Sequence, residues 1–228
     1  MTTSLYQAVL FDLDGTVLNT APDIINACRH TLSHFGYTCP DNSTLMTRVT
    51  AGMREMMKLG IPRKEWDTAP IETTMRNYFA DFYTSHICIK TTPFAGIESF
   101  IEKLANLHIK TAIITNKYKR MADELLRHFG FASHFSLVLG CDSLTHSKPH
   151  PEPLLTAMKL LSVEPEQTIY VGDHINDIRA AASAGCKSCA ALWGYGTGEC
   201  GDPSSWKADF YAENISALEI ICFGSKDY

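Results

Sequence analysis

The sequence lacks the features that mark membrane, secreted and nucleic-acid-binding proteins. No stretch of its 228 residues approaches the ~18 consecutive apolar residues that a membrane-spanning helix needs. Residues 1–7 have neither the basic start nor the long apolar segment of a signal peptide. The formal net charge is −5 and no block of like charge stands out, so no basic face for nucleic acid or a membrane surface is expected. We therefore expect a cytoplasmic protein with neither of these partners.

Cysteine is too sparse for a small disulfide scaffold. The eight cysteines are spread over the whole chain, which favours reduced thiols. Cys186 and Cys189 form a CxxC pair, but no second pair and no histidine at zinc-finger spacing accompanies it. The pair borders the apolar stretch 190–193, so we interpret both residues as ordinary buried or edge cysteines. Internal repeats and low-complexity tracts are absent as well.

The most informative feature is a pair of carboxylates at the end of a predicted strand. Asp12 and Asp14 follow the apolar residues 8–11, and Gly15 and Thr16 suit a tight turn. In an open α/β sheet, ligands bind at the carboxyl ends of the strands. Two carboxylates crowded at such a point require a cation, a shared proton or divided roles. The pair therefore predicts a functional site that holds a metal.

The order of the predicted elements indicates an α/β core with a helical insert. After Pro93, helices and strands alternate, which predicts a doubly wound (Rossmann-like) parallel sheet with helices on both faces. The helical patterns before Pro93 interrupt the first crossover. We expect the α/β catalytic core to comprise residues 1–20 and 92–228 and a helical cap to comprise residues 21–91. The expected helices are 21–35, 42–49, 53–59, 72–87, 97–107, 122–129, 154–161, 177–184 and 215–221, and the expected strands after the first are 111–115, 135–139, 168–171 and 188–192.

Two local patterns describe the inside of the helical segment. Thr20 suits the N-cap of its first helix, and Asp23 lies three residues on, as in a capping box. Met53, Met56 and Met57 recur at helical spacing, which is far more typical of core packing than of a cofactor site.

Three further predicted strands lead into polar residues. Thr115 and Asn116 follow one strand, and Lys148 lies in the loop after the next. Asp173 follows a third strand, with Asp177 four residues on. Doubly wound topology brings the carboxyl ends of such strands together. The sequence thus predicts one rim of acids, a hydroxyl group and a lysine.

This mixture of side chains suits phosphoryl transfer. Four acids alone would repel a phosphate, but a divalent hard cation held by carboxylates neutralises them and grips a phosphate oxygen. Thr115 and nearby N–H groups can bind the other oxygens, and Lys148 supplies a point charge. One carboxylate can act as nucleophile, and a second carboxyl, kept protonated by its neighbours, can act as acid and then base.

These residues resemble, in order, the four motifs of the haloacid dehalogenase superfamily. The run Asp-Leu-Asp-Gly-Thr at 12–16 is similar to the first motif and Thr115-Asn116 to the second. Lys148 is similar to the third, and Gly-Asp-His-Ile-Asn-Asp at 172–177 to the fourth. The resemblance covers the whole core. It implies an α/β core whose helical cap lies between the first and second motifs.

The resemblance also implies a role for each motif residue. Asp12 is the nucleophile and Asp14 the general acid/base. Mg²⁺ lies between the Asp12 side chain, the Asp14 backbone carbonyl and Asp173. Asp177 supports or contacts the ion. The side chains implied to hold the phosphoryl group are Thr115, Asn116 and Lys148.

Finer similarity points to the phosphoglycolate phosphatase branch. Four stretches look like that group: 18–24, 115–117, 148–154 and 193–196. The sequence departs from the pattern at Asn19, where Asp is frequent, and at His174, where a small polar residue is usual. Residues 50–54, Thr-Ala-Gly-Met-Arg, stand where the specificity loop of the cap usually reads Val-Gly-x-Gly. This last departure leaves the identity of the substrate open.

The function expected from these motifs is Mg²⁺-dependent hydrolysis of a small phosphorylated metabolite, with 2-phosphoglycolate as the first candidate. Three enzymatic alternatives remain: a phosphosugar mutase with the same core, another small-metabolite or nucleotide phosphatase, and a pyrophosphatase. In a dehalogenase, Asp14 would have no role in the reaction. A binding protein with a relic core would lack the nucleophile, the acid or the metal ligand, and all three are present. The pattern says nothing about oligomeric state.

Several polar residues near these motifs are ambiguous. Arg54 in the helical segment suits bidentate recognition of a substrate carboxylate, but it could equally be exposed. Lys117 could reach the phosphate or be solvated. The spacing of His146, His150 and His174 fits no metal-ligand template, so we expect loop hydrogen bonds from them, with His150 supporting the Lys148 loop.

Overall fold

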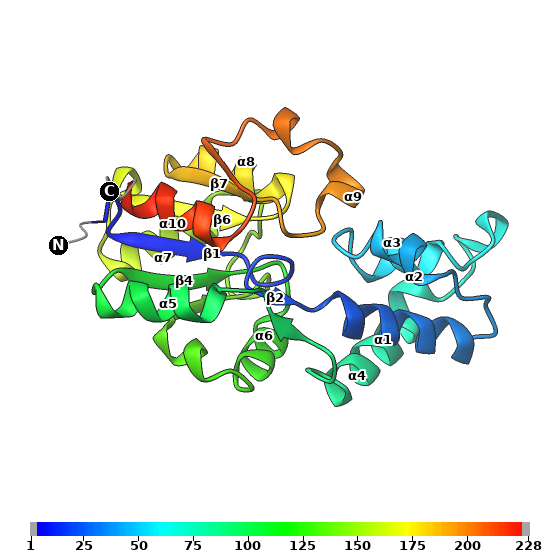
Figure 1. The fold of residues 1–228 in the computed structure, drawn as a ribbon. Coiled ribbons are helices and arrows are strands. Elements are labelled where there is room, and N and C mark those ends of the chain that lie inside the picture. Colours follow the sequence, from blue (N-terminus) through cyan, green and yellow to red (C-terminus); the bar gives the residue numbers. More distant parts are fainter. Residues whose placement is uncertain (1–3, 225–228) are drawn as a thin grey trace.

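The computed structural model of the chain describes residues 4–224, and a six-stranded sheet lies at its centre (Figure 1). All strand pairs in this sheet are parallel, and the strand order is β5-β4-β1-β6-β7-β8. The α/β prediction is therefore confirmed. The strands are β1 (Ala8–Phe11), β4 (Lys110–Ile114), β5 (Leu137–Leu139), β6 (Thr168–Gly172), β7 (Lys187–Ala191) and β8 (Phe210–Ala212).

The register of β1 with its neighbours positions the strand ends that carry the predicted site. Phe11 lies opposite Ile113 of β4 and Val171 of β6. From β1 the chain proceeds outward through β4 and β5, and then returns to add β6, β7 and β8 on the other side. A crevice forms at such a reversal, at the carboxyl ends of the strands. Asp12 and Asp173 consequently leave neighbouring strands at the same edge of the sheet.

Helices cover both faces of the sheet (Figure 1). They are α5 (Ile97–Asn106), α6 (Lys119–Leu126), α7 (Glu152–Leu161), α8 (Ile175–Ala184) and α10 (Ile215–Phe223). Because alternate residues of a strand point to opposite faces, β1 contributes to two separate cores. Val9 and Phe11 pack with α5, α6 and α10, whereas Ala8 and Leu10 pack with α7 and α8.

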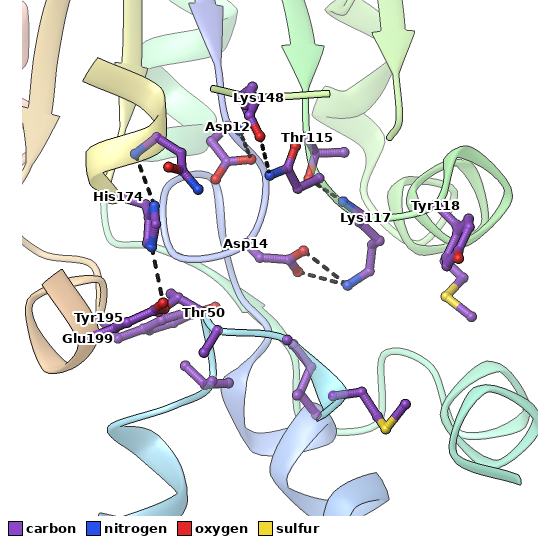
Figure 2. Close-up of a pocket in the computed structure, with 18 of the residues that line it drawn as sticks. Asp12, Asp14, Thr50, Thr115, Lys117, Tyr118, Lys148, His174, Tyr195 and Glu199 are labelled. Carbon is purple, nitrogen blue, oxygen red and sulfur yellow. Dashed lines mark hydrogen bonds and ion pairs between the residues drawn. The ribbon is translucent and has the colours of Figure 1, made fainter. Parts of the chain in front are cut away.

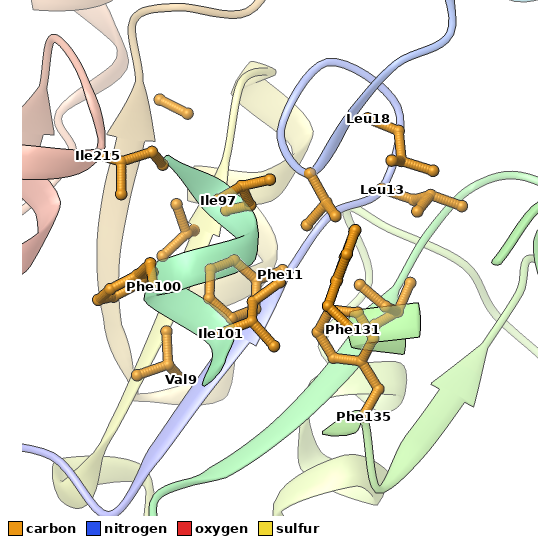
Figure 3. Packing of buried hydrophobic residues seen from close by; sticks show 14 of the residues in the cluster. Val9, Phe11, Leu13, Leu18, Ile97, Phe100, Ile101, Phe131, Phe135 and Ile215 are labelled. Atoms are coloured by element: carbon orange, nitrogen blue, oxygen red, sulfur yellow. The ribbon is translucent and has the colours of Figure 1, made fainter. Parts of the chain in front are cut away.

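Phe11 is the aromatic centre of the larger core (Figure 3). The centroid of its ring lies 6.2 Å from the centroids of Phe100 and Phe135, and the interplanar angles are 84° and 68°. Fully burying a side chain of this size stabilises the fold by about 1.5–3 kcal/mol. Since Phe11 directly precedes Asp12, this packing fixes the strand end that presents the first carboxylate.

A group of helices lies beyond the carboxyl edge of the sheet (Figure 1). They are α1 (Ala21–His34), α2 (Asn42–Met46), α3 (Met53–Lys58) and α4 (Arg76–Ser85), the last continuing directly from a π-helical turn, Ile71–Met75. These helices have a hydrophobic cluster of their own, with Leu32, Leu45, Met56, Met57 and Met75 fully buried. The prediction of core packing is confirmed for Met56 and Met57, whereas Met53 is half-buried, packs against this cluster and lines the cavity described below.

Two short strands join the helices to the sheet. β2 (Leu18–Asn19) pairs antiparallel with β3 (Thr92–Pro93), and Leu18 lies opposite Pro93. The chain therefore enters and leaves the helical segment at adjacent points.

The predicted capping box at the start of α1 is wrong. Thr20 occupies the N-cap position, but its side chain does not cap the helix; its hydroxyl donates to Asp14 Oδ1 at 2.6 Å. Asp23 Oδ2 instead accepts hydrogen bonds from the backbone N of Lys90 and Thr91, at 3.0 and 2.9 Å. Asp23 thereby ties α1 to the segment in which the chain returns to the sheet. Both polar groups serve long-range contacts that the local pattern does not reveal.

The remaining differences concern ends and short elements. The expected helix 42–49 ends at Met46, and the expected strand 135–139 begins at Leu137, because Gly130–His134 form a 3₁₀ turn before it. The short strands β2, β3 and β8 and the four-residue helix α9 (Thr197–Cys200) were not predicted. Each of these elements is too short for hydrophobic periodicity to identify it.

Membrane and disulfide features agree with the composition. Within residues 4–224, no helix combines the length and the apolar character needed to cross a membrane. All eight cysteines are free thiols. Cys186 and Cys189 are both buried, which confirms that they are ordinary core cysteines.

Candidate active site

Lys148 lies at the centre of a buried polar network (Figure 2). Its Nζ is 2.9 Å from Asp12 Oδ1 and 2.7 Å from Asp177 Oδ1. The same ammonium donates to Tyr170 Oη at 2.8 Å, and Tyr170 donates to the carbonyl of Ile114 at 2.7 Å. Burial alone lowers the pKa of Lys148, but Asp12 and Asp177 outweigh burial and raise it. Lys148 is therefore a fixed cation between the end of β1 and the start of α8.

Asp12 is held by the strand end itself. Its backbone N donates to the carbonyl of Val171 at 2.9 Å, and its Oδ1 accepts from the backbone N of Leu13 at 2.7 Å. The contact with Lys148 also uses Oδ1. Burial raises the pKa of Asp12 to about 7, against the opposing effect of Lys148. Contacts to a single oxygen thus orient the Asp12 carboxylate, and Lys148 compensates its negative charge only in part.

Asp173 sits in a backbone cradle. Its Oδ2 accepts from the backbone N of Tyr195 at 2.9 Å and of Gly196 at 3.1 Å, and the hydroxyl of Thr16 donates to its Oδ1 at 3.3 Å. Gly15 has φ +85°, and a Cβ there would lie 2.2 Å from Asp173 Oδ2. Only glycine leaves room for the carboxylate at this point. The loops after β1 and β7 therefore both close around Asp173.

Asp177 and His174 form the N-terminus of α8. His174 Nδ1 accepts from the backbone N of Asn176 at 3.0 Å, and the backbone N of His174 donates to Asp177 Oδ2 at 3.0 Å, which completes a capping box. Asp177 Oδ1 is the oxygen that accepts from Lys148. Both oxygens of Asp177 are therefore engaged in holding Lys148 and the helix end.

The carboxylate of Asp14 faces Lys117 and is paired with it (Figure 2). Lys117 Nζ lies 3.0 Å from each Asp14 carboxylate oxygen, and Thr20 Oγ1 donates to Oδ1. The hydroxyls of Thr20 and Tyr195 are 2.9 Å apart. Burial lowers the pKa of Lys117, but Asp14 outweighs burial and raises it. Lys117 is thus neither solvated nor directed away from the site.

Thr115 and Asn116 follow β4 directly. The side chain of Thr115 is buried, and its hydroxyl accepts from the backbone N of Lys117 at 3.2 Å. Asn116 Nδ2 donates to the carbonyl of Lys148 at 3.0 Å. Both residues line the same cavity as Asp12. The residues predicted from the strand ends are brought together here.

The donor set suits a divalent cation. Asp12, Asp173 and Asp177 each offer an oxygen, and these oxygens lie within 4.8 Å of one another. The four acids of the motifs and the two lysines carry a formal charge of −2, which one divalent ion would neutralise. Burial raises the pKa of Asp173 well above its ordinary value, and Asp12 and Asp177 add to the rise. Carboxylate oxygens are the kind of ligand by which Mg²⁺ is held in proteins.

A cavity of about 470 Å³ lies between the strand ends and the helices. This volume is in the range of small-molecule binding sites. Asp12, Thr115 and Lys148 line it from the sheet, and α4 and the loop before α3 line it from the helical segment. The cavity therefore has a polar floor formed by the motifs and a second wall formed by the helices.

Some predicted residues lie elsewhere. Arg54 is exposed, forms an ion pair with Glu72 at 3.0 Å and does not line the cavity described above. His146 Nδ1 is 2.9 Å from Glu152 Oε2, and His150 Nδ1 accepts from the backbone N of Glu152. The predicted loop hydrogen bonds are confirmed for His146 and His150, whereas His174 lines the cavity and its ring nitrogen caps α8.

Sequence reasoning missed several residues of the site. Tyr170 carried a detectable signal, because a hydroxyl within a fully buried strand requires a partner. Thr20, Tyr83 and Tyr195 also line or support the cavity. No local pattern marks these three residues as parts of the site, because their roles depend on tertiary contacts such as the one between Thr20 and Tyr195.

The sequence comparisons agree on one family. The model of the family "Haloacid dehalogenase-like hydrolase" matches residues 9–191. A phosphoglycolate phosphatase from Xanthomonas campestris pv. campestris is 37% identical over 212 residues, which cover 93% of this chain and 94% of the relative. An N-acetylmuramic acid 6-phosphate phosphatase from Pseudomonas aeruginosa is 31% identical, covering 93% of this chain and 92% of the relative.

Solved structures show the same architecture. The crystal structure of a predicted phosphoglycolate phosphatase from Haemophilus somnus has a TM-score of 0.82 and 25% identity, and the match covers 95% of this chain and 98% of that one. A haloacid dehalogenase-like hydrolase from Bacteroides fragilis has a TM-score of 0.79 at 24% identity, with 93% and 99% covered. These matches include the helical segment as well as the sheet.

Proposed function

The chain belongs to the haloacid dehalogenase-like hydrolase family, and on that premise we propose that it is a Mg²⁺-dependent phosphatase of small phosphomonoesters. The observation that carries the proposal is the meeting of Asp12, Lys148 and Asp173 at one edge of the sheet. Nucleophilic phosphoryl transfer requires a carboxylate that attacks phosphorus, a cation that stabilises the phosphoryl oxygens and a ligand for the metal ion. We assign these parts to Asp12, Lys148 and Asp173, in that order.

In the proposed reaction, Asp12 attacks phosphorus and forms an aspartyl-phosphate. Lys148 and Thr115 bind the oxygens of the phosphoryl group, and Asn116 holds the backbone of the Lys148 loop. Asp14 protonates the leaving oxygen as its bond to phosphorus breaks. It then takes a proton from the water that attacks the phosphorus of the aspartyl-phosphate, which frees Asp12 and releases inorganic phosphate. The contacts from Lys117 and Thr20 orient the Asp14 carboxylate for this second step, in which the ionised form is needed.

The proposed Mg²⁺ ligands are the Asp12 side chain, the Asp14 backbone carbonyl and Asp173. When bound, Mg²⁺ would neutralise the excess negative charge of the site and polarise a phosphoryl oxygen. We assign Asp177 a supporting role, because both of its oxygens already hold Lys148 and the start of α8.

We propose residues 21–91 as a cap that covers the substrate, with residues 1–20 and 92–228 as the catalytic core. The cavity is bounded by both parts, so closure would exclude water during the reaction. We propose 2-phosphoglycolate as the first candidate substrate, because relatives that cover nearly the whole chain carry that activity in their names. The Pseudomonas relative makes N-acetylmuramic acid 6-phosphate the second compound to test.

A phosphate-release screen over metabolite esters, with Mg²⁺ and with a chelator, tests the proposal. The Asp12→Asn variant serves as a control that keeps nearly the same volume at the strand end. We expect Mg²⁺-dependent release of free phosphate by the wild type and none by the variant, with the folds of both intact by circular dichroism. Turnover that survives in Asp12→Asn would contradict the nucleophile assignment. Transfer of the phosphoryl group without release would indicate a mutase instead.

A further inference from the structure

We propose that Lys117 and Tyr83 form an anion subsite that selects phosphate esters with a carboxylate on the part of the molecule that is not transferred. This inference rests on the proposed phosphatase function and names the class of substrate that the same cavity takes.

The first observation is a buried hydroxyl group with no partner. Tyr83, on α4, is 2% exposed and lines the cavity. Its Oη makes no hydrogen bond of 3.5 Å or less among residues 4–224, and the nearby ammonium of Lys117 opposes the rise in the pKa of Tyr83 that burial causes. A buried hydroxyl that stays unpaired is costly, and each such group in a folded protein calls for an explanation. A ligand atom that accepts a hydrogen bond from Tyr83 supplies one.

The second observation is the cation beside this hydroxyl. Lys117 Nζ lies 4.8 Å from the centroid of the Tyr83 ring. An ammonium group has three N–H bonds, and Asp14 accepts from Lys117 through its two oxygens. A further acceptor can therefore approach the ammonium from the side of Tyr83. One planar carboxylate, with an oxygen for each donor, matches this pair of groups.

The third observation is the charge of the wall that the helices provide. Arg76, Phe79, Ala80 and Tyr83 follow the spacing that places residues on one helix face, and all four line the cavity. Within the described residues, Arg76 is the single charged side chain that the helical segment contributes to this cavity. Its guanidinium contacts Tyr118 Oη of the core. The helices thus present one guanidinium and one hydroxyl to the substrate, whereas the acid Glu199 lines the cavity from α9.

A carboxylate suits the subsite better than other groups of similar size. A neutral hydroxyl on the substrate would leave the positive charge of Arg76, on the helical wall of the cavity, without a counter-charge. A second phosphate would bring about −2 charge next to the carboxylate of Asp14. A single carboxylate supplies one acceptor oxygen for Tyr83 and one for Lys117, and it adds only one negative charge beside Asp14.

The test compares two esters of nearly equal size on matched variants, with ethylene glycol bisphosphate as a third substrate. The substrates are 2-phosphoglycolate and 2-hydroxyethyl phosphate, which carries a neutral hydroxymethyl group in place of the carboxylate. Tyr83→Phe removes the unpaired hydroxyl and keeps the ring over Lys117. Tyr78→Phe is the control, because it removes a hydroxyl from the same helix whose partner is the exposed His30. Thermal midpoints establish that both variants fold.

We expect wild-type kcat/KM to favour 2-phosphoglycolate over 2-hydroxyethyl phosphate. Tyr83→Phe should reduce this ratio by about tenfold, the effect of losing one hydrogen bond to a charged group, mainly through a higher KM. Tyr78→Phe should leave the ratio unchanged.

Three outcomes would overturn the inference in different ways. Equal wild-type kcat/KM for the two esters would exclude a carboxylate subsite while leaving the phosphatase intact. An equal loss on both esters in Tyr83→Phe would show a structural role for the hydroxyl. Preference for ethylene glycol bisphosphate would replace the carboxylate by a second phosphate. No phosphate release from any ester would instead overturn the proposed function itself.

Discussion

Asp177 accepts a hydrogen bond from Lys148 Nζ through one oxygen, at 2.7 Å, and from the backbone N of His174 through the other, at 3.0 Å. Asp173, by contrast, has one oxygen whose protein contact is the long 3.3 Å bond from Thr16. The two acids of the fourth motif are therefore unequal. One is committed to protein groups, and the other has an oxygen to offer to a ligand.

This inequality predicts different phenotypes for two matched variants. Asp173→Asn should raise the Mg²⁺ concentration needed for half-maximal activity by tenfold or more, the effect of losing a charged ligand. Asp177→Asn should raise it much less but should weaken phosphate inhibition, because Lys148 loses its nearest carboxylate. Mg²⁺ titrations and inorganic phosphate inhibition measure the two effects. Equal Mg²⁺ requirements in both variants would place Asp177 among the metal ligands.

Gly15→Ala should abolish most of the activity. The φ of +85° strains any residue with a Cβ, by about 1–2 kcal/mol, and the new Cβ would lie 2.2 Å from Asp173 Oδ2. The carboxylate must therefore shift, and a displacement of about 1 Å can cost roughly 100-fold in rate. Gly36→Ala is the matched control, with φ +78° and no atom within 4 Å of the Cβ. It should lower the thermal midpoint and leave kcat unchanged; similar activity losses in both variants would contradict the steric explanation.

Thr20→Val should impair esters with poor leaving groups most. Thr20 donates to Asp14 Oδ1 at 2.6 Å, so its loss should disorder the proposed general acid. We expect kcat to fall about tenfold for an alkyl ester, within the range of general acid catalysis, and less for p-nitrophenyl phosphate, whose leaving group needs no proton. Thr31→Val, which removes a hydroxyl bonded within α1, is the control. Equal losses on both esters would argue against a role through Asp14.

The metal-free protein should become less stable as the pH rises from about 4 to 7. Burial raises the pKa of Asp12 from 3.8 to about 7 in the folded chain, so the folded chain binds more protons than the unfolded chain between these values. Stability falls with pH wherever the folded state binds more protons. The raised pKa of Asp173 acts in the same direction.

Bound Mg²⁺ takes the place of these protons, so its stabilising effect should grow with pH. Thermal midpoints with Mg²⁺ and with a chelator, at pH 6 and pH 8, measure this effect. The gain from Mg²⁺ should be larger at pH 8. A gain that is the same at both pH values would show that the buried carboxylates do not bind the ion.

The sheet and the motif residues were predictable because each depends on local sequence. Asp12, Thr115 and Asp173 each follow an apolar strand, and parallel topology places the ends of such strands together. Lys148 was predictable from the order of the motifs. These residues did not require knowledge of any side-chain direction.

The wall of the cavity opposite the motifs was not predictable in the same way. Arg54 and Arg76 both lie on helices, and nothing local distinguishes the one that pairs with Glu72 from the one that lines the cavity. Thr20 looked like a helix cap because its partners, Asp14 and Tyr195, lie on other segments. Side-chain direction in a small helical bundle depends on tertiary packing, which overrides local preference.

The antiparallel pair formed by Leu18 and Pro93 has an evolutionary consequence. Because these two residues are neighbours, the helical segment between them is an insertion whose ends lie side by side. A shorter, longer or unrelated insertion would bring its ends together at nearly the same entropic cost, because that cost rises only slowly with the length of the segment. Selection can therefore remodel what the enzyme recognises without rebuilding the machinery that breaks the bond.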